Sequence, residues 1–207
     1  VRVAGNIDVS APKRFISPSG TVIVQGRRVI HTGNIYANGR SGGKIKVLST
    51  ENLKLDGSLF ATGNKDKGGS VIVMSENSIQ TSAKTVIDVS GQLKGGTAQL
   101  LAKVKNKVSG NIFANSNLGK GGNIDITAEK TEIEKAEINA IGPQMGGKVR
   151  IGGEYLGGNL TNLDNKIKKG FVSRFGDHPP IDNSKQTIVK ADSNIDVSSD
   201  LGKGGTA

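Results

Sequence analysis

Apolar side chains alternate with other residues inside short phrases, and the phrases return along the chain. In Gly-Asn-Ile-Asp-Val-Ser (5–10) and its copies, the third and fifth residues are always apolar. Alternation with a period of two predicts a strand with one buried and one exposed face. The third residues are Ile7, Ile35, Leu59, Ile87, Ile112, Ile138 and Ile195, and the fifth are Val9, Ala37, Ala61, Val89, Ala114, Ala140 and Val197.

A Gly-Gly pair marks the start of a second alternating phrase. The pairs stand at 42–43, 68–69, 95–96, 121–122, 146–147 and 204–205, so the steps are 26, 27, 26, 25 and then 58 residues. The phrases after these pairs predict further strands, and residues 20–25 are an earlier copy. A weaker middle strand is expected in 52–56, 78–82 and 131–135.

Each period of about 26 residues therefore contains three short strands and a polar loop. One such unit cannot bury its apolar face alone, whereas stacked units align like residues into a continuous core. The sequence predicts an all-β fold, a right-handed parallel β-helix with three sheets and about seven turns. Residues 1–207 would form a single β-helix, and because the pattern runs to both ends we expect a fragment of a larger protein.

One segment has local preferences that oppose this fold. Residues 127–140 are rich in Ala, Glu and Lys with charge pairs four residues apart, which favours a helix. The repeat alignment places strands there instead. We expect strands, because stacking against the neighbouring copies outweighs a weak local propensity.

The Gly-rich phrase GKGGNIDITA (119–128) invites a phosphate-binding interpretation. A P-loop needs G-x-x-x-x-G-K-[ST], and a dinucleotide fingerprint needs a strand, a turn and a helix; the repeat provides neither. We interpret the glycines as corners between strands, where their free φ suits a tight turn. No cofactor is expected.

Composition and charge indicate which classes of binding partner suit the chain. The chain has 34% hydrophobic and 3% aromatic residues, no Cys and a net charge of +10. Acids are absent between Asp8 and Glu51 and between Asp88 and Asp125, where bases occur repeatedly. Such patches attract acidic glycans, phospholipid surfaces or nucleic acid, or they serve only as a solvated surface. No run of 18 apolar residues predicts a transmembrane helix.

Residues 152–187 interrupt the repeat and predict a long inserted loop. Aromatic side chains beside cations are able to hold a glycan or another anionic ligand. The alternative, which we favour, is a loop that packs its aromatics over one flank of the helix as a cover. The candidate ligand-binding residues are Tyr155, Lys166, Lys168, Lys169, Phe171, Arg174 and Phe175.

The phrases GGKVRIGGEYLGG (146–158) and TIVKADSNIDVSSDLGKGGTA (187–207) resemble the filamentous-haemagglutinin family of two-partner-secretion exoproteins. Glu154 stands where that family often has Asp. The resemblance covers most of the chain but is specific only after residue 146. It implies a β-helical fibre, secreted across the outer membrane of a Gram-negative bacterium by a partner protein and displayed as an adhesin. The family's N-terminal secretion domain is not recognised in the chain.

Catalysis is the competing class, because pectate-lyase-like and polygalacturonase-like enzymes also use parallel β-helices. They need clustered acids. Asp8, Asp88 and Asp196 face outward on distant turns, and the one acidic cluster (Glu129, Glu132, Glu134, Glu137) is interleaved with Lys130 and Lys135. His31 and His178 have no companion His or Cys. We expect no enzyme and no metal site. A polysaccharide-degrading enzyme and the stalk of a haem-acquisition or contact-dependent toxin exoprotein stay as alternatives.

Overall fold

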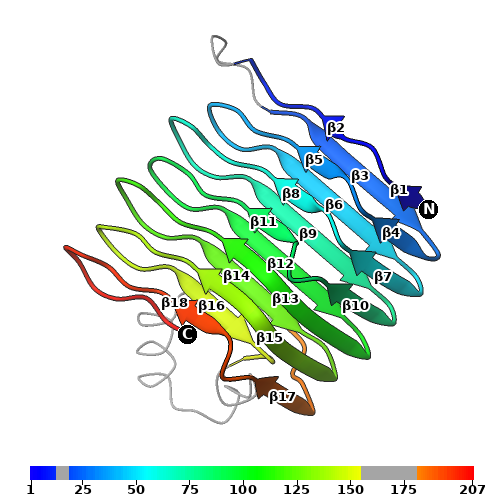
Figure 1. Cartoon of the computed structure of the whole chain (residues 1–207). Coiled ribbons are helices and arrows are strands. Elements are labelled where there is room, and N and C mark those ends of the chain that lie inside the picture. The colour runs from blue at the N-terminus through cyan, green and yellow to red at the C-terminus, as the bar shows by residue number, and fades with distance from the viewer. Residues whose placement is uncertain (13–18, 155–180) are drawn as a thin grey trace, which may run out of the picture.

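The computed structural model describes residues 1–12, 19–154 and 181–207. These residues form an all-β solenoid of about six turns with roughly 26 residues per turn, which confirms the predicted fold class (Figure 1). Every strand pairs in parallel with its equivalent in the neighbouring turns. The first face is a six-stranded sheet of β3 (Thr21–Gly26), β6 (Lys44–Ser49), β9 (Ser70–Ser75), β12 (Thr97–Ala102), β14 (Asn123–Thr127) and β16 (Lys148–Ile151).

The other two faces contain the remaining strands. The second face has β1 (Arg2–Val3), β4 (Val29–His31), β7 (Asn52–Leu55), β10 (Ser78–Thr81) and β17 (Gln186–Val189). The third face has β2 (Ile7–Asp8), β5 (Asn34–Tyr36), β8 (Ser58–Phe60), β11 (Val86–Asp88) and β18 (Asn194–Asp196). Because β13 (Lys105–Phe113) and β15 (Lys130–Asn139) run through the corner, they join the second and third faces into one 12-stranded sheet.

The apolar positions form columns in direct register along the axis. On the third face Ile35, Leu59 and Ile87 pair one above the other, and each is fully buried. The same column runs from Ile7 to Ile195, as the alternation predicted. Because rungs of a parallel sheet are about 4.8 Å apart, like side chains stack continuously. The first face contributes a matching column of Val22, Ile45, Val71, Ala98, Ile124 and Val149.

Residues 130–139 form strand β15, so the prediction of strands over a helix is confirmed. Ile133 and Ile138 of this strand are fully buried in the core. Lys135 lies between them with φ of 50°, where the strand turns the corner between the second and third faces. Tertiary stacking has therefore overridden the helical propensity of the segment.

The Gly-Gly pairs lie at the corners before the first-face strands, as expected, but free φ is not the reason for them. Gly121 and Gly122 do not have positive φ. A Cβ added at Gly122 would lie 2.1 Å from the carbonyl oxygen of Gly96 in the neighbouring turn. Close approach of stacked backbones, and not conformational freedom, excludes a side chain there.

Candidate functional site

The predicted ligand-binding residues Tyr155, Lys166, Lys168, Lys169, Phe171, Arg174 and Phe175 lie outside the described residues. Their role stays a prediction. The structure does describe the two ends of the predicted insertion, residues 152–154 and 181–187, and the last two of these residues already belong to β17. These ends show how the insertion joins the solenoid.

Hydrogen bonds tie the two ends of the insertion together. Ser184 N donates to Gly152 O at 2.7 Å, and Glu154 N donates to Asn183 Oδ1 at 2.8 Å. Gly152 and Gly153 have φ of 81° and 130°, which side-chain-bearing residues rarely adopt. The chain therefore leaves and rejoins the solenoid at one place.

A buried ion pair fixes this place to the first face. The Arg150 Nε atom lies 2.6 Å from Asp125 Oδ1, and the same guanidinium also bonds Glu154. Gln99 Nε2 donates to the other carboxylate oxygen of Asp125 at 3.0 Å. Burial alone would lower the pKa of Arg150, but the hydrogen bond and charge of Asp125, with Glu154, outweigh it and raise the pKa. Because Asp125 is almost fully buried and its carboxylate is fully used, it is a structural acid.

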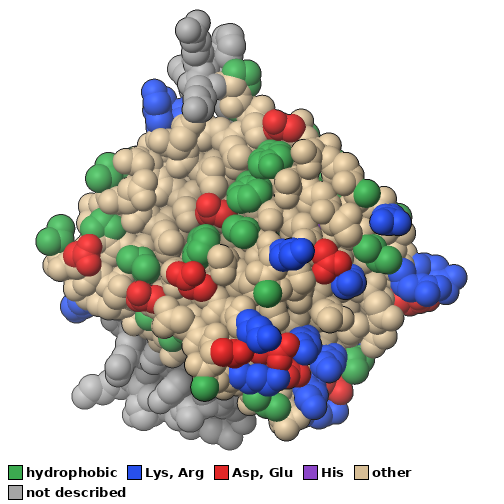
Figure 2. All heavy atoms as spheres, viewed as in Figure 1, with side chains coloured by type: hydrophobic (Ala, Val, Ile, Leu, Met, Phe, Trp, Pro, Cys, Tyr) green, Lys and Arg blue, Asp and Glu red, His purple; other side chains and the backbone are tan. Residues whose placement is uncertain are grey.

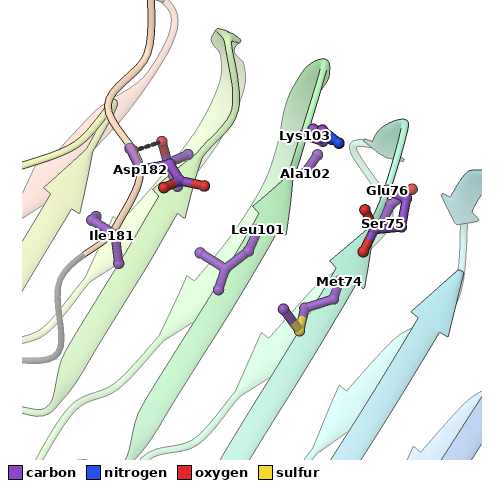
Figure 3. Close-up of a pocket in the computed structure, with 9 residues that line it drawn as sticks. Met74, Ser75, Glu76, Leu101, Ala102, Lys103, Ile181 and Asp182 are labelled. Atoms are coloured by element: carbon purple, nitrogen blue, oxygen red, sulfur yellow. Dashed lines mark hydrogen bonds between the residues drawn. The ribbon is translucent and has the colours of Figure 1, made fainter. Parts of the chain in front are cut away.

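Beside this ion pair, a shallow groove of about 330 Å³ runs along the first face (Figure 3). Ile181 and Asp182 overhang one side, and Thr127 Oγ1 donates to Asp182 O at 2.5 Å. The charged residues that line it are Glu76, just after β9, Lys103, just after β12, and Asp182. Its lining is Met74, Ser75, Glu76, Leu101, Ala102, Lys103, Thr127, Ile181 and Asp182.

The acidic cluster on β15 is bound by lysines of the neighbouring turns. Lys107 Nζ lies 2.6 Å from Glu134, and Lys190 Nζ lies 2.8 Å from Glu132 and also bonds Glu134. Hydrogen bonds from Lys107 and Lys190 lower the pKa of Glu134 to about 2. Lys130 and Lys135, which lie between these acids in the sequence, are not the ion-pair partners of Glu132 and Glu134, because stacking brings β13 and Lys190, which follows β17, alongside.

The outward aspartates of the third face also have structural partners. In each of Asp8, Asp88 and Asp196, Oδ1 accepts the backbone N–H of the serine two residues later at 2.8 Å. This is an Asx turn, which bends the chain at the end of the strand. The repeated Asp-Val-Ser therefore encodes a turn, and none of these acids meets a second one.

Outward side chains also stack along the axis. Tyr36 and Phe60 lie on adjacent rungs, and their rings are stacked with centroids 5.2 Å apart. Figure 2 shows hydrophobic and acidic side chains following one another in an oblique line across the face that it presents. Because the ring faces cover each other, this stack is a packing feature and not an open aromatic platform.

His31 is a core residue. Its side chain is 1% exposed, Nε2 lies 3.5 Å from Ser58 O, and Nδ1 has no partner. Burial lowers its pKa. Within residues 1–12, 19–154 and 181–207, no group of three or more His, Asp or Glu is arranged to hold a metal ion. His178 lies outside that part of the chain.

The acid-free stretches of the sequence do not form single patches. Lys94 and Lys120 lie at the corner that leads from the third face to the first, and they pair with each other in register. Lys103 follows β12 and Lys105 begins β13, so both lie at a different corner. Lysines from different turns are therefore brought together when they occupy the same corner of the solenoid. Counting the basic residues along the sequence does not reveal this grouping.

No family model and no curated protein matches the sequence. Among solved structures, the chain is similar to the crystal structure of the HMW1 secretion domain from Haemophilus influenzae, with a TM-score of 0.71 and 23% identity. The match covers 94% of this chain and 49% of that one, so the chain spans about half its length. No helix in the described part of the chain is long and apolar enough to cross a bilayer. The chain therefore shares its β-solenoid fold with a secretion domain. The sequence phrases alone had not indicated a similarity to that type of domain.

Proposed function

We propose that this chain is a structural segment of a large secreted bacterial exoprotein that extends from the cell surface as a β-helical fibre. The observation that carries the proposal is the unbroken register of the inward columns, from Ile7 to Ile195. Stacking identical units produces length. The fold similarity to a secretion domain and the phrases after residue 146 support export through an outer-membrane partner.

The proposal assigns no reaction to the chain. The acids that sequence reasoning weighed as catalytic all have structural partners in the described residues. The three aspartates lie in Asx turns, Glu129, Glu132 and Glu134 pair with lysines, and Glu137 accepts a hydrogen bond from Asn139 Nδ2. A general acid or nucleophile must be free to act on a bound substrate. No arrangement in the described residues favours the alternative of a polysaccharide-degrading enzyme.

Fractionation of the source bacterium tests the proposal. Antibodies raised against this chain should label intact cells or the culture supernatant, together with a known surface marker. A cytoplasmic marker should stay unlabelled on the same intact cells. Detection only in the cytoplasmic fraction would contradict secretion and display.

As the alternative to a packing cover, we also propose that an adhesive contact, with host glycans or other polyanions, lies on the inserted loop that contains Lys166, Lys168 and Lys169. Aromatic and cationic side chains together suit anionic saccharides. Replacing these three lysines with serine should abolish retention on a heparin column at low salt. The matched control replaces Lys44, Lys46 and Lys84, which lie outside the insertion. If the loop variant and the control variant were retained equally, the binding site would not lie on the loop.

A further inference from the structure

The loops that lead from the third face to the first face project side by side along the left of Figure 1. Near their tips, Lys67, Lys94, Lys120, Met145 and Lys203 pair in parallel register from turn to turn. The exposed residues Leu93, Leu118 and Leu201 lie one or two positions before a lysine of this row. We call these eight residues the loop ridge.

The leucines of the loop ridge are exposed, although the fold buries most of its aliphatic residues in columns. Leu93 is 52% exposed, Leu118 53% and Leu201 85%. A single exposed leucine needs no explanation, but a set at the same place in several turns does. Backbone bonds hold the tips in register, since Leu118 N donates to Gln92 O at 2.9 Å and Leu93 N donates to Asp66 O at 3.1 Å.

The lysines of the loop ridge add a row of positive charge. All four are exposed, and the described residues offer no ion-pair partner to them. Asp66, the acid beside Lys67, accepts a hydrogen bond from Ser41 Oγ at 2.8 Å. Lys67 pairs with Lys94 and Lys94 with Lys120, so their backbones are about 5 Å apart and their charges repel one another unless an anionic surface neutralises them.

We propose that the loop ridge docks on an anionic phospholipid surface. The lysines contact lipid phosphates, and the leucines enter the boundary between headgroups and acyl chains. The leucines decide between ligand classes. A soluble acidic polymer would bind the lysines, but the exposed leucines beside them would add nothing to its affinity. In a bilayer, both the lysines and the leucines contribute to the free energy of binding.

Vesicle co-sedimentation tests this proposal with the whole chain. Vesicles of phosphatidylglycerol and phosphatidylcholine should bind the protein, and pure phosphatidylcholine should bind it far less. Replacing Lys94 and Lys120 with serine should weaken partitioning about 30-fold, given about fivefold per lysine. Replacing Leu93 and Leu118 with serine should weaken it about tenfold.

Two matched controls separate the ridge from general charge and hydrophobicity. Lys84→Ser with Lys105→Ser removes two exposed lysines elsewhere, and Ile23→Ser with Val104→Ser removes side chains that are 60% and 45% exposed. Neither should change binding more than about twofold. Loss of binding in the controls equal to that in the ridge variants would overturn the proposal. So would binding to heparin that ignores the leucine changes, without binding to vesicles.

Discussion

At the scale of single residues, space between neighbouring turns decides which positions tolerate a side chain. Gly122 faces the backbone of Gly96 so closely that a Cβ has no room, whereas nothing lies within 4 Å of the Cβ position of Gly204. Both glycines belong to Gly-Gly pairs, but Gly122 is the second of its pair and Gly204 the first, and the counterpart Gly121 would meet Ala140 O at 2.1 Å. The pattern predicts where the corners are, but only the stacking shows why glycine is needed there.

Gly122→Ala should therefore destabilise the protein by about 2 kcal/mol or more, because two backbones must move apart. Gly204→Ala is the matched control and should change the free energy of unfolding by less than about 0.5 kcal/mol. Urea denaturation followed by circular dichroism measures both. Similar losses for the two variants would show that close approach is not the cause.

His31 should make the protein sensitive to mild acid. Its side chain lies in the core column between Val3 and Leu55, and burial lowers its pKa from the ordinary value of 6.5. Unfolding releases a histidine that binds a proton more readily, so stability is complete above about pH 6.5 and falls as the pH decreases below it.

Replacing His31 with leucine, the residue at the same position in the next turn, should flatten this dependence between about pH 6.5 and 5. Thermal melts at several pH values compare the variant with the unchanged chain. If both lose the same stability across that window, a different group is responsible.

Some inward residues were beyond prediction from the pattern. Asn106 occupies the second-face column that begins with Val29, Leu53 and Ile79, and it is fully buried. Its Nδ2 donates to Leu100 O at 2.7 Å. An asparagine within a polar stretch is predicted to be exposed, so the sequence pattern did not predict that Asn106 belongs to the core.

At the scale of elements, the sequence predicted strands well where several copies could be aligned. It identified β15 against a local helical preference, because its isoleucines matched those of the other turns. It could not predict the partners of Glu132 and Glu134. Those partners come from β13 and from Lys190, which follows β17, and β17 returns only after the insertion.

Lys190 is expected to hold the turn after the insertion against β15. Lys190→Gln removes contacts to both Glu132 and Glu134 and should lower the melting temperature more than Lys185→Gln. Lys185 bonds only Glu129, and both side chains of that pair are largely exposed, so its contribution is small. Equal melting temperatures for the two variants would contradict this role.

The same cluster predicts a second acid transition. The pKa of Glu134 falls from 4.5 to about 2, so its contribution to stability is present above pH 4.5 and is lost as the pH falls towards 2. In Lys190→Gln the remaining partner is Lys107, so the pKa of Glu134 is lowered less. The loss of stability below pH 4.5 should therefore be smaller and should end at a higher pH. An unchanged acid limb in the melting profile would show that the pair does not stabilise the fold.

At the scale of the whole molecule, the account depends on one continuous solenoid that bypasses the insertion. The column Thr21, Lys44, Ser70, Thr97, Asn123, Lys148 and Thr206 crosses the entire first face in register. The regular spacing of the Gly-Gly pairs predicted this column up to residue 148. The last step of 58 residues left the position of the final turn open.

Spin-label distances measure this arrangement directly, since the chain has no cysteine and accepts labels at chosen sites. Labels on Thr21→Cys and Asn123→Cys are four rungs apart and should lie about 19 Å from each other before allowance for the label arms. Labels on Thr21→Cys and Thr206→Cys are six rungs apart and should lie about 29 Å from each other. A distance between Thr21 and Thr206 that is no longer than the first, or that is broad and far beyond it, would contradict a continuous solenoid.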